Sequence, residues 1–261
     1  MNAAIAASIG DVIAEDAESL AALHDRELTA DMIAALREAD FPACLGLMPA
    51  TAGAVEAWQA MAEGVAHLPV DITPADLDAL AAEYAAIYLT GAYGASPHES
   101  VWTDDDHLTC QAAMFQWRDI HAAAGLATPD WRQRPDDHLV LQLLHLAQAA
   151  RRAATADSWR RLAALLDEHT LRWLPEFAAR VAARSESPFY AGLAVLTAAW
   201  VNGVRDLMAT QLDEPRPTRE EIEARLRPTP GATEQPVAFM PGAHGPSWSP
   251  TDQRHCAKLG P

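Results

Sequence analysis

Hydrophobic positions recur at helical spacing along most of the chain. Apolar residues three and four positions apart predict amphipathic helices, and no segment alternates convincingly as a half-buried strand does. The pattern therefore predicts an all-α fold, a single globular domain of about ten helices. The predicted helices cover residues 11–23, 29–39, 53–67, 74–89, 106–124, 137–155, 158–170, 172–184, 188–211 and 218–226.

Several of these helices carry sequence signals at their ends. Thr73 precedes Pro74, and Ser187 precedes Pro188, so each pair places a hydroxyl N-cap before a proline in the first helical turn. Gly125 follows a run of alanines and predicts a helix C-terminus, because glycine tolerates the left-handed conformation found there. These signals predict helix boundaries near residues 74, 125 and 188.

Two long irregular segments interrupt the helical pattern. Residues 90–105 and 125–136 are rich in Gly, Pro and Asp, and ordered loops of this length in helical domains are often functional. We predict a helical domain over 1–212 with a hinge-like loop at 125–136. A short helical extension over 213–227 and a mobile, proline-rich tail over 228–261 follow it.

The charge is large, negative and unevenly distributed. The chain has 36 acidic and 19 basic residues, a net charge of −17. Residues 1–110 hold 19 Asp and Glu but two Arg, whereas later residues hold 17 of each sign. Such a surface repels polyphosphate, so nucleic-acid binding is not expected. Two interpretations stay open, a cationic partner and solubility alone.

The composition also limits the compartment. No apolar stretch of about 18 residues without charge is present, so no membrane insertion is predicted. Residues 1–10 are apolar but lack the basic start and cleavage site of a signal peptide. Three widely spaced cysteines favour neither a disulfide framework nor a zinc ribbon. We predict a cytoplasmic protein.

Catalytic and metal-binding signals are weak. The chain has no glycine-rich phosphate loop, Gly-x-Ser-x-Gly or His-Glu-x-x-His motif. Asp104 and His107 supply one pair of possible ligands, and His244, His255 and Cys256 lie in the proline-rich tail. We therefore predict no metal, no cofactor and no enzymatic activity.

The two irregular segments carry the most specific residue patterns. The first follows an aromatic helix end, Glu83-Tyr84-Ala85-Ala86-Ile87-Tyr88, and runs through Tyr93 to Pro97-His98-Glu99-Ser100-Val101-Trp102. The second ends in Pro135-Asp136-Asp137-His138-Leu139, which opens a strongly apolar helix. An Asp at such a position can cap free backbone N–H groups, and capping alone is one interpretation of Asp136.

Together these segments resemble the TorD/DmsD family of cytoplasmic chaperones for molybdopterin oxidoreductases. Family members carry a Glu-Tyr helix, a Pro-x-Glu-Ser-Val-aromatic loop end and a later Pro-Asp-His-Leu motif. The stretches His169–Trp173, Phe177 and Pro188–Ala194 are similar to later family helices, and the resemblance covers about residues 30–210. Gln142 and His145 stand where the family usually has a Glu and an aromatic residue.

The resemblance implies a function in recognition. Family members bind the twin-arginine leader of a client enzyme and hold its apo form until the molybdenum cofactor is inserted before export. The implied partners are a molybdopterin-dependent oxidoreductase and its leader, and the implied state is a monomer or a domain-swapped dimer. An apolar groove beside negative charge suits a basic, apolar leader. The predicted leader-binding residues are Tyr84, Ile87, Tyr88, Tyr93, Pro97, Glu99, Ser100, Trp102, Asp136, Asp137 and His138.

Two other classes of function stay open at this point. One is a helical regulatory or ligand-binding module without an export role. The other is a metal-dependent hydrolase that uses Asp104, His107, Asp137 and His138, for which the spacing supplies no three convergent ligands.

Overall fold

The structure is a computed structural model and describes residues 3–227, with side chains from Ala6 onward. The predicted all-α class is confirmed, since this part of the chain contains helices and no strand. The predicted tail, 228–261, lies outside the described residues. The elements are α1 (Ala3–Asp25), α2 (Ala30–Glu38), α3 (Ala52–His67), α4 (Pro74–Tyr84), η1 (Ala85–Leu89), α5 (Ser100–Thr103), α6 (Ala112–Ala123), α7 (Leu139–Arg152), α8 (Ala156–Leu165), η2 (Leu166–Thr170), α9 (Leu171–Arg184), α10 (Pro188–Leu212) and α11 (Arg219–Leu226).

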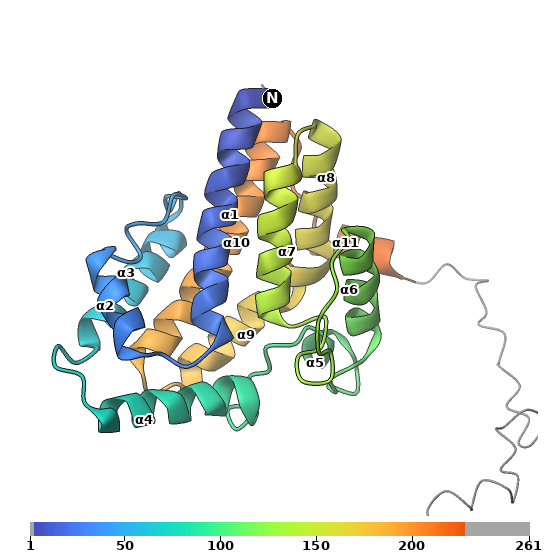
Figure 1. Cartoon of the computed structure of the whole chain (residues 1–261). Coiled ribbons are helices and arrows are strands. Elements are labelled where there is room, and N and C mark those ends of the chain that lie inside the picture. Colours follow the sequence, from blue (N-terminus) through green and yellow to red (C-terminus); the bar gives the residue numbers. More distant parts are fainter. Residues whose placement is uncertain (1–2, 228–261) are drawn as a thin grey trace, which may run out of the picture. The chain divides into compact units, whose positions relative to one another are not determined.

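Helix pairs that are distant in sequence form the core of the first structural unit, which ends at Ile222; a second unit begins at Glu223. Helix α1 packs along α7, and α10 packs along both α3 and α9. Figure 1 shows α1 and α7 side by side, with α8 next to α7. Three tryptophans, Trp117, Trp173 and Trp200, are completely buried in this unit. No helix of the described residues is long and apolar enough to cross a membrane.

Two glycines allow α3 and α10 to approach closely. A Cβ atom on Gly192 would lie 2.8 Å from the carbonyl oxygen of Ala60 and 2.9 Å from the Cα of Met61. A Cβ atom on Gly64 would lie 2.7 Å from the carbonyl oxygen of Pro188. Both distances are too short for real atoms, so the backbones meet here only because the side chains are absent.

The predicted helix ends are largely confirmed. Thr73 and Asp76 form a reciprocal capping box at α4, and the hydroxyl of Ser187 accepts from the backbone N–H of Phe189 at α10. Gly125 follows α6 with a φ of +74°, as a C-terminal glycine does. Local signals therefore set these boundaries.

Four differences from the prediction are evident, and the first is that α1 begins at Ala3 and not at residue 11. The helix expected from residue 106 begins at Ala112, because His107 and Cys110 have positive φ angles and the preceding acidic run forms a turn. The helix expected from residue 137 begins at Leu139. The short α5 lies inside the predicted loop 90–105. The other three differences fall at or beside the two motif-bearing segments.

Two π-helical turns lie within otherwise regular helices. The first, η1, continues α4, and the second, η2, joins α8 to α9 without a break where two separate helices were expected. Single π turns of this kind are frequent at functional sites. Their buried residues include Tyr88 in η1 and Asp167, His169 and Thr170 in η2.

Candidate functional site

The two motif-bearing segments lie directly against each other. The backbone N–H of Leu139 donates to the carbonyl of Pro97 at 2.8 Å, and that of Glu99 donates to the carbonyl of Asp137 at 3.3 Å. His98 and His138 form an antiparallel bridge between the segments, and their rings meet edge to face at 4.9 Å. We call this contact, formed by residues 96–100 and 135–139 with the side chains that bond to them, the loop junction.

Glu99 is the centre of a buried polar network in the loop junction. Its side chain is fully buried, and its Oε2 accepts from the indole N–H of Trp117 at 2.7 Å and from the amide of Gln142 at 3.0 Å. Its Oε1 is bonded to Nδ1 of His169 at 2.9 Å. Three donors from α6, α7 and η2 therefore compensate the loss of hydration of this carboxylate.

Asp137 fixes the start of α5 from the opposite segment. Its Oδ2 accepts from the backbone N–H of Ser100 at 2.8 Å and from the hydroxyl of Ser100 at 2.5 Å. The carbonyl of Asp137 also accepts from Gln142 at 3.0 Å, and the carbonyl oxygen of the Gln142 side chain accepts from Thr170 at 2.8 Å. Asp137 therefore joins the two segments and does not cap the helix that follows it.

His138 takes the capping role expected of an aspartate. Its Nδ1 accepts from the backbone N–H of Val140 at 3.1 Å, which places His138 at the N-cap of α7. Burial lowers the pKa of His138 well below its ordinary value, so the ring is neutral at pH 7. Nδ1 is then an unprotonated acceptor and the proton is on Nε2.

Asp136 connects the loop junction to α6. Its Oδ2 accepts from Nε and from a terminal nitrogen of Arg118, at 3.1 and 3.0 Å, and its Oδ1 accepts from the hydroxyl of Thr128 at 2.6 Å. Pure capping by Asp136 is therefore not what the structure shows. The guanidinium of Arg118 lies between two exposed rings, 5.5 Å from Phe115 and 4.9 Å from Trp131.

The predicted apolar-groove residues fall into two groups. Ile87, Tyr84 and Tyr88 are buried in the core, where the two tyrosine rings stack at 4.6 Å and the hydroxyl of Tyr88 is bonded to Nδ1 of His24 at 2.6 Å. Tyr93 and Trp102 are half-buried at the edge. The indole N–H of Trp102 donates to the carbonyl of Ser96 at 2.8 Å, and Phe177 contacts both Tyr88 and Trp102.

The structure thus brings six of the predicted residues together, Pro97, Glu99, Ser100, Asp136, Asp137 and His138. All six are buried, so in this conformation they hold the segments in place and do not form an open surface. The prediction missed Trp117, Gln142 and His169, which supply the donors to Glu99. Gln142 carried a usable signal, because an amide among leucines on a buried helix face needs a polar partner.

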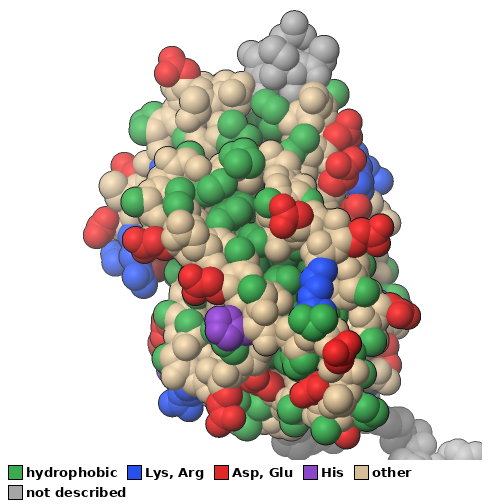
Figure 2. Space-filling model, turned by 90° about the vertical axis from the view of Figure 1, so that its left-hand side faces the viewer, with side chains coloured by type: hydrophobic (Ala, Val, Ile, Leu, Met, Phe, Trp, Pro, Cys, Tyr) green, Lys and Arg blue, Asp and Glu red, His purple; other side chains and the backbone are tan. Residues whose placement is uncertain are grey.

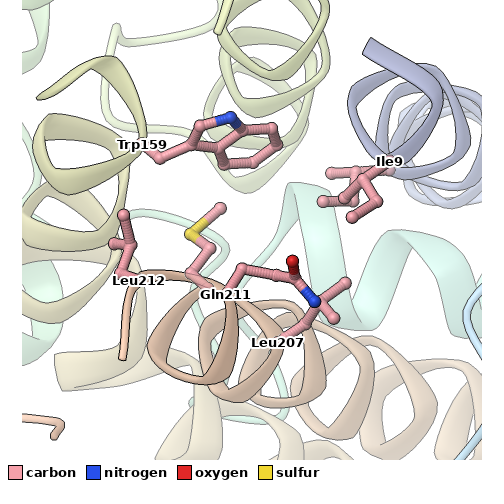
Figure 3. Close-up of a pocket in the computed structure, with 7 residues that line it drawn as sticks. Ile9, Trp159, Leu207, Gln211 and Leu212 are labelled. Carbon is pink, nitrogen blue, oxygen red and sulfur yellow. The ribbon is translucent and has the colours of Figure 1, made fainter. Parts of the chain in front are cut away.

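Within residues 3–227, neither the arrangement of possible metal ligands nor the small apolar cavity beside Trp159 supports a catalytic centre. Within residues 3–227, no group of three His, Cys, Asp or Glu side chains is placed to hold a metal ion. The imidazole of His107 is hydrogen-bonded to the carbonyl of Val101 at 2.9 Å. An apolar cavity between α1, α8 and α10, in which the ring of Trp159 lies over the side chains of α10, holds about 10 Å³, less than one ligand needs (Figure 3).

Comparison with known proteins identifies the fold family. A family model described as the nitrate reductase delta subunit matches residues 47–179, about half of the chain and the whole loop junction. The chain belongs to the TorD/DmsD family. The resemblance found in the sequence is confirmed.

Three similar relatives are named chaperone protein TorD. The Vibrio cholerae protein is 31% identical over 130 residues, covering 47% of this chain and 59% of the relative. The Shewanella oneidensis protein is 28% identical over 135 residues, 49% of this chain and 60% of the relative. The Shewanella amazonensis protein is 34% identical over 128 residues, covering 46% of this chain and 52% of the relative. This TorD/DmsD family member therefore matches between half and three-fifths of the length of these relatives.

Proposed function

We propose that this chain is a cytoplasmic chaperone in molybdoenzyme maturation. In this proposal it binds the twin-arginine leader and the apo form of a molybdopterin oxidoreductase and assists cofactor insertion before export. Membership of the TorD/DmsD family and the name of its relatives, chaperone protein TorD, support this assignment. A chaperone of this kind needs a recognition surface and no catalytic group, so no cofactor and no enzymatic activity are part of the proposal.

The loop junction is the observation that carries the proposal. A buried network holds the two motif-bearing segments together, and exposed side chains lie on these segments and on the neighbouring α6. Phe115 is 53% exposed and Trp131 is 38% exposed, although large aromatic side chains are usually buried. Asp105 and Asp106 lie exposed in the turn before α6. Both rings contact the guanidinium of Arg118, so in this proposal they meet the apolar stretch of the leader, and Asp105 and Asp106 supply the negative charge for its arginines.

The residues predicted from the sequence take two roles in this proposal. Tyr93 and Trp102, which are half-buried, contact the leader directly. The others position the surface: Tyr84, Ile87, Tyr88, Pro97, Glu99, Ser100, Asp136, Asp137 and His138. Aspartates at the rim steer the arginines of the leader and pair with them, while the rings cover its apolar stretch.

A second face of the molecule is a competitor for the same leader. Figure 2 shows hydrophobic side chains gathered in the middle of the face that carries α2 and α3 in Figure 1, with acidic side chains around them. Met48, before α3, is 69% exposed, and Val55, within α3, is 41% exposed. This face does not carry the clamped loops, so we assign the leader to the loop surface.

Calorimetry with a synthetic twin-arginine leader tests this assignment. Trp131→Ala and Phe115→Ala should each weaken binding about tenfold, which corresponds to roughly 1.4 kcal/mol for a lost anchor. Met48→Ala and Leu144→Ala, which remove exposed apolar side chains elsewhere, should leave affinity unchanged. Loss of binding in Met48→Ala alone would move the site to the competing face.

A matched peptide tests the chemistry of recognition. Replacing the two arginines of the leader by lysines keeps the charge but removes the forked donors, so affinity should fall. If neither peptide binds, a helical regulatory or ligand-binding module becomes the better description. A pulldown that recovers a molybdopterin oxidoreductase from native cytoplasm would identify the client.

The loop 125–136 also bears on the oligomeric state. Residues 125–136 are the proposed hinge for exchange of C-terminal helices, and a monomer and a domain-swapped dimer are both compatible with the contacts at the loop junction. Sedimentation of the purified chain distinguishes the two.

A further inference from the structure

An open cavity lies between α6, α7 and α8. Its volume is about 490 Å³, within the range of small-molecule sites. Its walls are mainly apolar and include Ile120, Leu162 and Leu165. Five polar residues also line it, namely His145, Gln148, Arg152, Ser158 and Arg161. A few polar groups among apolar walls are typical of sites that orient a ligand.

The charge of this cavity is opposite to that of the protein. None of its lining residues is acidic and two are arginines, although the chain has a net charge of −17. Both Arg152 and Arg161 are exposed to solvent. Arg152 uses one terminal nitrogen to donate to the carbonyl of Ala124 at 3.1 Å, which leaves other N–H groups of its five. An anionic ligand would therefore find a local positive potential here.

A hydrogen bond between His121 and His145 determines which ring nitrogen of His145 can accept a hydrogen bond from a ligand. Nε2 of His121 lies 3.2 Å from the carbonyl of Asp136, which only accepts, so His121 carries its proton on Nε2. Nδ1 of His121 is 3.2 Å from Nδ1 of His145 and must then accept, so His145 donates from Nδ1. Burial lowers the pKa of both rings, that of His145 to about 4, which keeps them neutral at pH 7.

The remaining ring nitrogen of His145 is consequently an unprotonated acceptor. Within residues 3–227, no protein group hydrogen-bonds to this Nε2, and His145 lines the cavity. His145 is only 6% exposed and lines the cavity, so an O–H or N–H donor bound there would satisfy this lone pair.

We propose that this cavity binds a small organic acid that also carries a hydroxyl or N–H donor. Its carboxylate pairs with the guanidinium groups of Arg152 and Arg161, its donor bonds to Nε2 of His145, and its apolar body lies against Leu162 and Leu165. No residue of this site belongs to the proposed leader surface, so an experiment can contradict either proposal without affecting the other.

The site is connected to the loop junction through the same histidines. A ligand bonded to His145 acts on His121, which holds the carbonyl of Asp136. The side chain of Asp136 in turn holds Arg118 and Thr128. A ligand in the cavity is therefore connected to the segment 128–136 by a continuous series of hydrogen bonds.

A series of three probes tests the proposal on the unmodified full chain at pH 7.5. 4-Hydroxybenzoate carries the acid, the ring and the donor, benzoate lacks the donor, and phenol lacks the acid. Titration followed by ligand-observed NMR should show that 4-hydroxybenzoate binds about tenfold more tightly than either of the others, since each lacks one good polar contact. Equal affinity of benzoate and 4-hydroxybenzoate would overturn the role of His145.

A pair of double variants locates the binding. Arg152→Gln with Arg161→Gln should abolish the preference for 4-hydroxybenzoate over phenol. The control, Arg151→Gln with Arg160→Gln, removes the same charge from the same two helices, but these arginines pair with Glu18, Asp157 and Glu214 outside the cavity. An equal loss in the control would mean that overall charge, not this site, attracts the acid, and the proposal would be wrong.

The histidine rings provide an independent readout. Long-range ¹⁵N spectra of the free protein should show the proton of His121 on Nε2 and that of His145 on Nδ1. Saturating 4-hydroxybenzoate should shift the Nε2 resonance of His145, and benzoate should not. No shift with either compound would contradict the proposed pose.

Discussion

The α3–α10 interface and the loop junction are both buried, but they are held together by different physics. The helices meet over Gly64 and Gly192, where the fit is steric and no side chain intervenes. At the loop junction, Glu99 and Asp137 are fully buried and each is bonded to groups from another segment. The first region depends on volume, and the second depends on hydrogen bonds to buried carboxylates, although Oδ1 of Asp137 has no partner among the described residues. Each should therefore fail under a perturbation that leaves the other intact.

Acid should have the largest effect and should act on two buried histidines outside both regions, His24 in α1 and His145 in α7. Burial lowers the pKa of His24 to about 3 and that of His145 to about 4, below the ordinary 6.5. A histidine whose pKa is depressed by folding stabilises the fold above pH 6.5, and that contribution is lost as the pH falls toward the folded-state pKa. Between pH 7.5 and 5.0 each should cost about 2 kcal/mol in the free energy of unfolding, about 4 kcal/mol together.

Urea unfolding followed by tryptophan fluorescence at both pH values measures this loss. Replacing the exposed His67 by Gln should leave the difference between the two pH values unchanged. A free energy of unfolding that is the same at pH 7.5 and 5.0 would show that the buried histidines accept protons without cost.

Glu99→Ala should have the next largest effect, because it leaves three buried donors without an acceptor. Trp117, Gln142 and His169 each lose their bond to the carboxylate, and we expect a loss of about 3 kcal/mol in the free energy of unfolding. Glu56→Ala on the exposed surface of α3 is the matched control and should change stability by less than about 0.5 kcal/mol. An equally small effect at Glu99 would mean that the network contributes little.

Gly192→Ala should have the smallest of the three effects and should be independent of pH. The added Cβ must displace the backbone of α3, and overpacking of this kind costs about 2 kcal/mol. Gly53→Ala, in the first turn of α3 with open space around it, should be neutral or slightly stabilising. If Gly192→Ala lost more stability at pH 5.0 than at pH 7.5, the two regions would not be independent.

The sequence predicted the helices well because the signals for them are local. Thr73, Ser187 and Gly125 mark helix ends through contacts within four residues, and each does so in the structure. The start of α6 was missed because consecutive aspartates look alike in a helix and in a turn. The positive φ of His107, which decides between them, is not apparent from its residue type.

The sequence predicted that residues of both segments form one leader-binding site, but it did not predict that these residues are buried. From the sequence alone, a glutamate such as Glu99 is expected at the surface. Its burial depends on hydrogen-bond donors at positions 117, 142 and 169. No periodicity relates these positions, since three different helices bring them together. Hydrogen bonds between buried polar groups that are distant in sequence can be identified only in the folded structure.

The π turn η2 has a consequence for sequence alignment. A π turn holds one residue more than the α turn it replaces, and residues in an α-helix are related by about 100° of rotation. Without the extra residue, Asp167 and His169 would face different neighbours from Arg205 and Glu99, their present partners. Alignments of related chains should therefore place a one-residue gap within 166–170 wherever a regular helix replaces η2, and those chains should lack this pairing.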